Sequence, residues 1–147
     1  MVGPLLIFLH TQAVGSRVRE PNGLRMERKT RQRDAIRNVF RRVGRPLGPQ
    51  EILEHAKGEV PGLGIATVYR NVKSLVEEGW LAPIEIPGQP TCYEAAGLAH
   101  HHHFHCKTCG KVFDVEGCPG ELHDLTPPGF RTDSHEVILY GRCALCS

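Results

Sequence analysis

The segment GIATVYRNVKSLVEEGWLAPIEIPGQPTCYE, residues 64–94, decides the fold of this chain. Apolar side chains recur at helical spacing in its first part, at Val68, Val72, Leu75 and Val76. This spacing predicts a helix that begins at Ala66 or Thr67 and ends at Gly79. The second part, residues 80–94, has two extended runs on either side of a PGQP turn and predicts a β-hairpin.

The sequence before this segment predicts two further helices. The first begins near Thr30 and ends at Gly44, and the second begins near Pro49, a residue suited to a first helical turn. Their apolar faces consist of Ala35, Ile36, Val39, Phe40 and Val43 in the first and Ile52, Leu53 and Ala56 in the second. Three short helices followed by a hairpin predict a winged helix–turn–helix, whose third helix enters the major groove of DNA.

This helical half is also basic. Between Arg25 and Arg45, nine Lys and Arg residues stand against Glu27 and Asp34, a local net charge of +7. A run of charge is usually a solvated face, but here it adjoins a predicted DNA-binding motif. The third helix leaves outward polar side chains that can reach DNA, namely Thr67, Tyr69, Arg70, Lys73 and Ser74.

Length and composition limit the class of protein. A chain of 147 residues fits one mid-sized domain or two small ones, and it cannot hold a large multi-layer enzyme. With 40% hydrophobic and 23% charged residues, wholesale disorder and a membrane-embedded class are both excluded. Residues 1–84 carry 14 Lys/Arg against 8 Asp/Glu, whereas residues 85–147 carry 4 against 8, so the two halves face different partners.

The first 25 residues show no helix or strand pattern that continues into the domain. Their one apolar run, Pro4 to Leu9, is far shorter than the roughly 20 residues of a membrane-spanning helix. It also lacks the preceding positive charge of a signal peptide. We therefore expect a disordered extension over residues 1–25, a true start at Met26, and a cytoplasmic protein with no membrane partner.

The C-terminal half contains four cysteines in two C-x-x-C pairs, Cys106, Cys109, Cys143 and Cys146. Each pair can turn two thiolates toward one centre, which predicts a tetrahedral zinc site. Two disulfides would require an oxidising compartment, and a thioredoxin-like redox pair would require a βαβ context. In a half too small to bury much core, the zinc would be structural. Cys92 and Cys118 remain as small buried hydrophobes or inert thiols.

A run of five histidines, interrupted by one phenylalanine, occupies residues 100–105 just before the first C-x-x-C pair. Side chains of an extended chain alternate between two faces. One face then carries His101, His103 and His105, and the other carries His100 and His102. Two faces can serve two metal sites, because neutral imidazole suits Zn, Fe, Mn or Ni, and added carboxylates favour harder ions. The available partners are Glu94, Glu121, His123 and His135.

Together, these motifs resemble the ferric uptake regulator family of dimeric bacterial transcription factors, whose members sense metals, peroxide or haem. The motifs are TRQR at Thr30, GIATVYRNV at Gly64, CYE at Cys92, HHHHFHCKTCGKV at His100 and HEVILYGRCALC at His135. The resemblance covers residues from about 28 to 147 and implies an α+β fold. A winged helix–turn–helix core would occupy residues 26–84, with its hairpin wing reaching about residue 95, and a small α/β dimerisation domain with the four-cysteine zinc site would occupy residues 96–147.

The resemblance also implies roles for particular residues. DNA contacts fall on Arg28, Lys29, Thr67, Tyr69 and Arg70, and structural zinc falls on the four C-x-x-C cysteines. A regulatory divalent metal (Zn, Fe or Mn) at the hinge between domains falls on Glu94, His101 and His103, with Cys92 as a candidate further ligand. An additional site in the dimerisation domain falls on His100, His102, Glu121 and His135.

Three features depart from the family pattern. Many relatives supply a hinge histidine just before the second helix, where this chain reads Arg45-Pro46-Leu47-Gly48, so Cys92 or His55 is a candidate replacement. In the additional site His102 stands where iron-sensing relatives often have Asp, and a third imidazole favours zinc over harder ions. The helix expected in the C-terminal half is short, because PGELHDL runs directly into two prolines.

We therefore predict a homodimeric, metal-dependent repressor that binds the operator DNA of metal-homeostasis genes and is not an enzyme. Metal at the hinge would bias the angle between domains so that both recognition helices meet successive major grooves. The alternatives are a metal-dependent hydrolase and a metal buffer. The hydrolase lacks an H-E-x-x-H motif and an open zinc position beside a general base, and neither alternative needs the GIATVYRNV helix.

Overall fold

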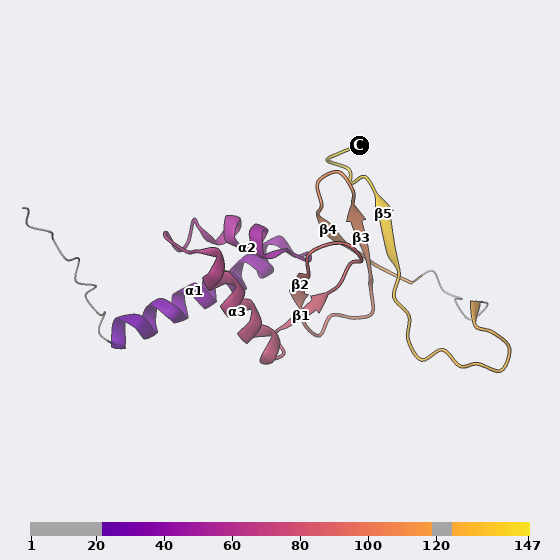
Figure 1. Cartoon of the computed structure of the whole chain (residues 1–147), viewed down its shortest axis with the longest axis horizontal. Coiled ribbons are helices and arrows are strands. Elements are labelled where there is room, and N and C mark those ends of the chain that lie inside the picture. The colour runs from indigo at the N-terminus through magenta and orange to yellow at the C-terminus, as the bar shows by residue number, and fades with distance from the viewer. Residues whose placement is uncertain (1–21, 119–124) are drawn as a thin grey trace, which may run out of the picture.

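The structure is a computed structural model that describes residues 22–118 and 125–147. Its elements, in chain order, are α1 (Asn22–Val43), α2 (Pro49–Ala56), α3 (Ile65–Glu77), β1 (Leu81–Ile84), β2 (Cys92–Ala95), β3 (His102–Cys106), β4 (Val112–Val115) and β5 (Ile138–Gly141). In Figure 1, the three helices lie on one side of the molecule, the β1–β2 pair lies in the middle, and β3, β4 and β5 form a sheet beyond it. We call α1 to β2 the helical half and the remainder the sheet half.

The helical half is built around one apolar core to which every helix contributes. Side chains with at most 1% exposure come from each helix and the turn between the first two, namely Ile36, Val39, Leu47, Ile52, Ala56, Val68, Val72 and Leu75. α2 begins at Pro49, as predicted, and the Glu51 carboxylate accepts a hydrogen bond from the Gly48 amide. α3 begins at Ile65, one or two residues before the predicted start at Ala66 or Thr67, and the chain turns out of the helix at Gly79, where a φ of 71° favours glycine.

α1 begins at Asn22, eight residues before Thr30, where we expected the first helix to begin. Residues 22–25, assigned from the sequence to a disordered extension, are therefore helical, and residues 1–21 lie outside the described part of the chain. Residues 23–31 are exposed on every side of this helix. Apolar periodicity could not reveal its first turns, because no described segment covers them and no apolar stripe is required.

The predicted hairpin is present. β1 pairs antiparallel with β2, from Leu81 opposite Ala95 to Ile84 opposite Cys92. The hairpin is joined to the helices at the turn before α2, where Leu47 and Tyr93 exchange two backbone hydrogen bonds of 2.9 Å. Any ligand carried by β2 is therefore fixed to the helical half.

The sheet half has the strand order β4–β3–β5, with β3 antiparallel to β4 and parallel to β5. Its described residues contain no α-helix, although we expected an α/β domain. The short helix predicted in PGELHDL falls almost entirely on residues 119–124, outside the described part of the chain. No described helix is long and apolar enough to cross a membrane.

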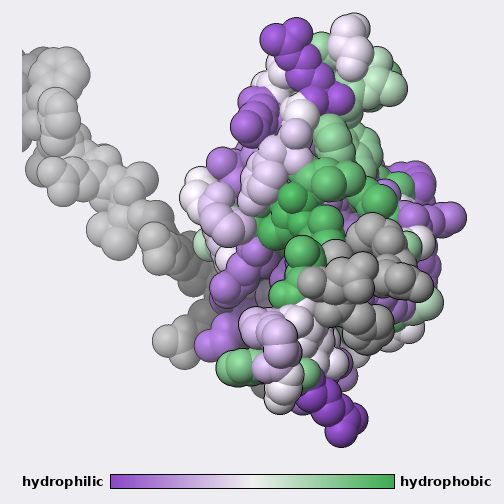
Figure 2. Space-filling view, turned by 90° about the vertical axis from the view of Figure 1, so that its right-hand side faces the viewer, coloured by the Kyte–Doolittle hydropathy of each residue, from purple (hydrophilic) through white to green (hydrophobic). Residues whose placement is uncertain are grey.

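A second, smaller core joins the two halves. Ile84, Ile86 and Cys92 of the hairpin region pack with Val112 of β4, and Ile138 of β5 lies against them. Beyond this core the sheet half leaves apolar surface uncovered, since Leu139 and Tyr140 of β5 are 47% and 45% exposed. Figure 2, which views the side of the molecule that carries β5, shows hydrophobic side chains gathered at the centre of that face.

Candidate functional site

Four cysteines come together at one end of the sheet half. Cys106 ends β3, Cys109 lies in the turn to β4, and Cys143 and Cys146 follow β5; their four Sγ atoms all lie within 4.8 Å of one another. The turn closes through Gly110, whose φ of 72° lets its amide donate to the Cys106 carbonyl at 2.8 Å. All six cysteines of the chain are free thiols in the structure, so no disulfide competes for this cluster.

Backbone amides prepare this cluster for a cation. The Cys109 amide, followed by the Cys143 amide, lowers the pKa of the Cys106 thiol to about 6, and the Cys143 N–H lies 3.3 Å from Cys106 Sγ. The lowered pKa favours the thiolate, the form that binds metals. Four sulfur ligands without a carboxylate suit a closed tetrahedral zinc site.

A second cluster lies where the helical half meets the sheet half, and we call it the hinge cluster. It contains Glu94 of β2, His101 and His103 at the start of β3, and Asp114 of β4, with one possible ligand atom from each within 4.8 Å of the others. Glu94 Oε2 lies 3.0 Å from His101 Nε2 and 3.3 Å from His103 Nε2. Because Glu94 belongs to the hairpin and the other three to the sheet half, the cluster joins both parts of the chain.

The hinge cluster has the electrostatic features of a cation site. The His101 Nδ1–H donates to the Ala99 carbonyl at 2.8 Å, which leaves Nε2 as the ring nitrogen that faces Glu94. This backbone bond, supported by Glu94, raises the pKa of His101. Asp114 Oδ1 is buried without a hydrogen-bond partner, and burial, aided by the Glu94 charge, raises the pKa of Asp114. A divalent metal would satisfy this oxygen and neutralise the two carboxylates.

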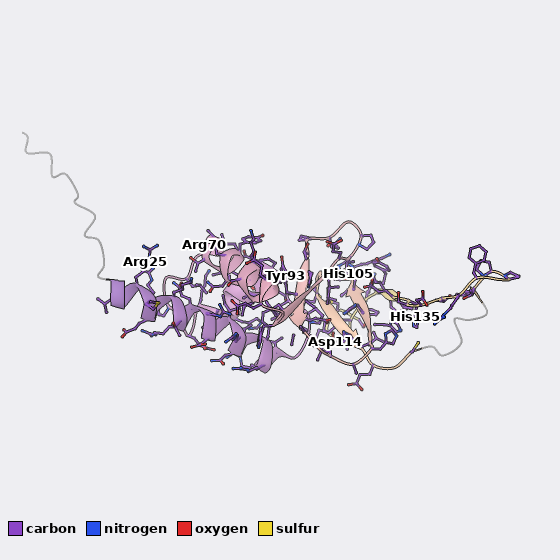
Figure 3. The ribbon with its side chains drawn as sticks, turned by 90° about the horizontal axis from the view of Figure 1, so that it is seen from below. Arg25, Arg70, Tyr93, His105, Asp114 and His135 are labelled. Atoms are coloured by element: carbon purple, nitrogen blue, oxygen red, sulfur yellow. The ribbon has the colours of Figure 1, made fainter. Side chains whose placement is uncertain are left out.

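Asp114 was missed by the sequence reasoning. The register of β3 and β4 places it directly opposite His103, a pairing that depends on the turn around the cysteines. The one local signal was an acidic residue within the otherwise apolar run VFDV. Figure 3 shows Asp114 on the sheet half, near its boundary with the hairpin that carries Tyr93.

Neither candidate for the missing hinge histidine belongs to the hinge cluster. Cys92 is 9% exposed, packs in the core between the halves and has its Sγ 3.8 Å from the Pro90 carbonyl, and burial raises the pKa of its thiol. This environment is that of a small buried hydrophobe, and Cys92 lies outside the hinge cluster. His55 is exposed on α2 and also lies outside the cluster.

A third cluster occupies the other face of β3, and we call it the outer cluster. It consists of His100, His102, Cys118 and His135, whose ligand atoms also lie within 4.8 Å of one another. The structure thus divides His100 and His102 from His101 and His103, as strand alternation predicts. Cys118 was not predicted here, and Glu121, which was, lies outside the described residues. His105 joins neither cluster, because its buried ring packs edge-on against Tyr140.

The predicted DNA-contacting residues lie on exposed surfaces of the helical half. On α3, Tyr69 is 55% exposed, Arg70 is exposed, and Arg70 Nη2 donates to the half-buried Thr67 hydroxyl at 3.1 Å. Arg28 and Lys29 are exposed on α1. Figure 3 shows Arg25 and Arg70 projecting from the same side of the helical half.

Five residues of the basic run make contacts within the chain. Arg33 pairs with Glu78, and the guanidinium carbons of Arg37 and Arg41 lie 5.3 Å and 5.9 Å from the centre of the Trp80 ring. The remaining two, Arg42 and Arg45, pair with Glu59 and Glu51. Most of these arginines pair with carboxylates of the same chain, although Arg41 and Arg42 remain exposed. The N-terminal part of the basic run, residues 25–31, contains the basic residues on the exposed end of α1.

Comparison with known proteins agrees with this geometry. Residues 22–140 match the profile described as the ferric uptake regulator family. The chain is 31% identical over 123 residues to the ferric uptake regulation protein of Campylobacter jejuni, covering 80% of this chain and 78% of that protein. It is 34% identical over 91 residues to the transcriptional regulator FurA of Mycobacterium tuberculosis, covering 60% and 62%. This chain therefore belongs to the ferric uptake regulator family, a family of metal-responsive regulators.

Solved structures show the same fold. The ferric uptake regulator Fur of Helicobacter pylori, a protein with three functional metal binding sites, superposes with a TM-score of 0.62 at 26% identity, over 84% of this chain and 89% of that one. A zinc-bound manganese uptake regulator superposes with a TM-score of 0.67 at 26% identity, over 82% and 96%.

Proposed function

We propose that this chain is a homodimeric, cytoplasmic repressor that binds the operator DNA of metal-homeostasis genes when a divalent metal occupies the hinge cluster. The hinge cluster carries this proposal, because its ligands come from both halves of the chain. Glu94 is fixed to the helices through β2, whereas His101, His103 and Asp114 belong to the sheet half. A metal shared by these residues favours one angle between the halves, and the angle sets where α3 meets DNA.

In this proposal the helical half acts as a winged helix–turn–helix and β1–β2 as its wing. α3 enters the major groove, where Thr67, Tyr69 and Arg70 face base edges and neighbouring phosphates. Arg28 and Lys29, exposed on α1, contact the phosphate backbone. The exposure of Tyr69, a large aromatic side chain, supports a ligand-facing role for α3.

The metal assignment follows the donor atoms. The four cysteines hold structural zinc, whose binding free energy becomes folding free energy for a sheet half with a small core. The hinge cluster, with two imidazoles and two carboxylates, holds the regulatory ion, and this donor set suits Zn, Fe or Mn. The described residues contain three such clusters, and the Helicobacter pylori relative has three functional metal binding sites, which supports metal binding at each cluster.

The alternatives explain less of the molecule. A metal-dependent hydrolase requires an open metal position beside a general base, whereas the hinge cluster offers four protein ligands to one ion. A metal buffer requires the three clusters but not an exposed α3 connected to one of them. The relatives are named as regulators, which also favours a regulator over an enzyme.

The proposal is tested by DNA affinity across a metal series. A duplex is selected from a random library by the metal-loaded protein, and its affinity is measured by fluorescence anisotropy with Zn²⁺, Mn²⁺, Fe²⁺ or a chelator. We expect metal to raise the affinity about 5- to 150-fold, the usual range of allosteric coupling. The double variant His101→Ala, His103→Ala should remain a zinc-containing dimer but lose this response.

His55→Ala is the matched control, because His55 is an exposed histidine of the helical half outside the hinge cluster. It should respond to metal as the unaltered chain does. A double variant that keeps the metal response would contradict the hinge assignment. An unaltered chain that selects no duplex in any metal would contradict the repressor function itself.

A further inference from the structure

The outer cluster contains the thiol of Cys118 in addition to three histidines, and all four side chains can bind one metal ion. Cys118 Sγ lies 3.0 Å from His135 Nε2, and His135 Nε2 lies 3.2 Å from His100 Nε2. The imidazole rings of His100 and His102 meet edge-on, with their centres 4.7 Å apart. Three imidazoles and one thiol therefore converge from three separate segments, the start of β3, the loop after β4 and the irregular segment before β5.

His102 provides an independent sign that this cluster holds a ligand. The residue is only 1% exposed, and its Nε2 atom is buried without a hydrogen-bond partner, while the Val137 N–H lies 3.2 Å from Nδ1. Such orphaned ring nitrogens are rare in folded proteins and require an explanation. A metal bound at Nε2 would supply the missing partner. The ring proton would then lie on Nδ1, and Nδ1 would no longer accept the hydrogen bond from the Val137 N–H.

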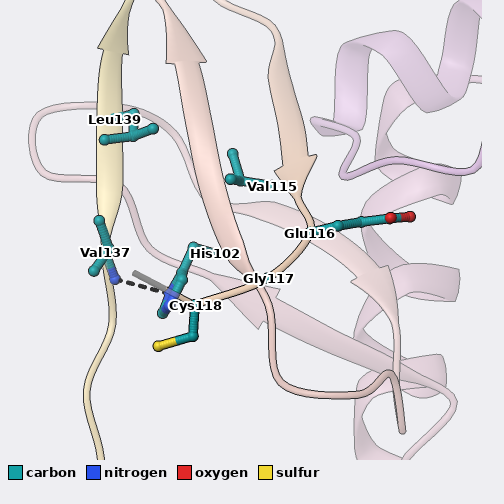
Figure 4. A pocket seen from close by; sticks show the side chains of 7 residues that line it. All are labelled: His102, Val115, Glu116, Gly117, Cys118, Val137 and Leu139. Atoms are coloured by element: carbon teal, nitrogen blue, oxygen red, sulfur yellow. Dashed lines mark hydrogen bonds between the residues drawn. The ribbon is translucent and has the colours of Figure 1, made fainter. Parts of the chain in front are cut away.

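The surroundings of Cys118 favour a ligand as well. The thiol and His102 line one pocket, whose other walls include the apolar side chains of Val115, Val137 and Leu139. Figure 4 shows the Cys118 and His102 side chains lying next to each other, while the carboxylate of Glu116 points away from them. No Asp or Glu belongs to the outer cluster among the described residues, in contrast to the two carboxylates of the hinge cluster.

We propose that Cys118 is the fourth ligand of a His₃Cys site, formed with His100, His102 and His135, that selects zinc over manganese and other hard divalent ions. The donor set is the reason, because thiolate and imidazole suit zinc in a tetrahedral geometry, whereas manganese prefers carboxylate and water oxygens. The inference rests on the proposed function in one respect, that these histidines bind metal. The proposed thiolate ligand also distinguishes the outer cluster from the hinge cluster, which contains no cysteine.

Cobalt titration of the full-length dimer tests this assignment. Co²⁺ takes tetrahedral sites like those of zinc, and a bound thiolate produces a charge-transfer band in the near ultraviolet that imidazole and carboxylate ligands do not produce. The four-cysteine site is first confirmed by zinc counting to retain its zinc, so that it contributes no cobalt band. We expect the band to rise to saturation at one thiolate-bound cobalt per chain.

Three variants test which cysteine supplies the sulfur ligand that produces the band. Cys118→Ser should lose the band and at least about tenfold in zinc affinity while keeping the dimer and its structural zinc, because Cys118 is exposed. Cys92→Ala, at the cysteine outside the clusters, should keep the band; alanine is used because Cys92 is buried in the core between the halves. Glu121→Gln should also keep it and leave zinc affinity unchanged. A band that persists in Cys118→Ser, or that disappears in a Cys92→Ala protein that remains a zinc-containing dimer, overturns the proposal.

A measurement on the unaltered chain makes the test independent of the variants. Alkylation of Cys118 by iodoacetamide, followed by peptide mass spectrometry, should slow at least about tenfold when zinc is added after chelation and should be unaffected by manganese. Cobalt absorption without a thiolate band, together with unprotected Cys118, would refute the Cys118 ligand alone. If the protein binds no metal beyond the structural zinc, both the Cys118 assignment and the proposed metal-dependent DNA binding are refuted.

Discussion

Replacing Arg45 should weaken the junction between the two halves, whether or not metal is bound. Arg45 lies in the turn before α2, and its side chain is 13% exposed. The guanidinium contacts Glu51 through two nitrogen–oxygen pairs, the closer at 2.5 Å, and donates to the Pro46 carbonyl at 2.9 Å. It also reaches the sheet half, with Nη1 3.5 Å from the Val112 carbonyl and Cζ 5.4 Å from the centre of the Phe113 ring.

These contacts determine how much stability the protein should lose when Arg45 is replaced. A hydrogen bond to a charged group contributes about 1.5 to 3 kcal/mol, and a cation over an aromatic ring adds about 0.5 to 1 kcal/mol. Glu51 is 22% exposed, so water reaches the carboxylate left behind, and the larger penalty of a fully buried charge does not apply. Arg45→Met should therefore lower the free energy of unfolding by about 2 to 4 kcal/mol.

Urea unfolding at fixed protein and zinc concentrations measures this change as a shift of the midpoint with an unchanged slope. A double-mutant cycle with Glu51→Gln should give a coupling of about 1 to 2 kcal/mol, above the 0.2 to 1 kcal/mol typical of exposed ion pairs. Arg31→Met, on the exposed part of α1, is the control and should change stability by less than about 0.5 kcal/mol. An Arg45→Met protein as stable as this control would refute the reasoning.

Other changes separate the roles of the two halves. Cys143→Ser should lose the structural zinc, unfold the sheet half and give monomers or aggregates, as measured by zinc counting and size-exclusion chromatography. Arg70→Ala should reduce the ratio of operator to random-DNA affinity by about 1 to 3 kcal/mol, whereas Lys29→Ala should weaken all sequences alike and lower the salt slope by about one. Leu75→Ala should cost about 2 to 5 kcal/mol of stability in urea, because the residue is fully buried.

Features that depend on neighbouring residues could be predicted from the sequence. The helix α3 and the hairpin after it follow from apolar spacing and a PGQP turn, and both are present within a few residues of the expected bounds. The separation of His101 and His103 from His100 and His102 follows from the alternation of side chains along a strand. The cysteine cluster follows from two C-x-x-C pairs, since each fixes the geometry of its own pair of thiols.

Features that depend on how distant segments meet could not be predicted. Asp114 enters the hinge cluster only through the register of β3 against β4, and Cys118 enters the outer cluster only because the loop after β4 returns to His135. A basic residue looks the same in sequence whether it faces DNA or a carboxylate of the same chain. The pairing of Arg33 with Glu78, 45 positions later, is therefore visible only in three dimensions.

The three clusters depend on one another through β3, which ends in Cys106 and carries histidines of both other clusters. Cys106 pairs with Gly141 of the parallel strand β5, so zinc shared with the two cysteines after β5 fixes the register of the two strands. The same register brings the Val137 carbonyl to the His103 amide at 3.1 Å and the Val137 amide to His102. Loss of the structural zinc should therefore disrupt the hinge and outer clusters together, whereas loss of the hinge metal leaves the register intact. A sensor requires this asymmetry, because an exchangeable ion can report on its concentration only if a permanent one preserves its site while it is empty.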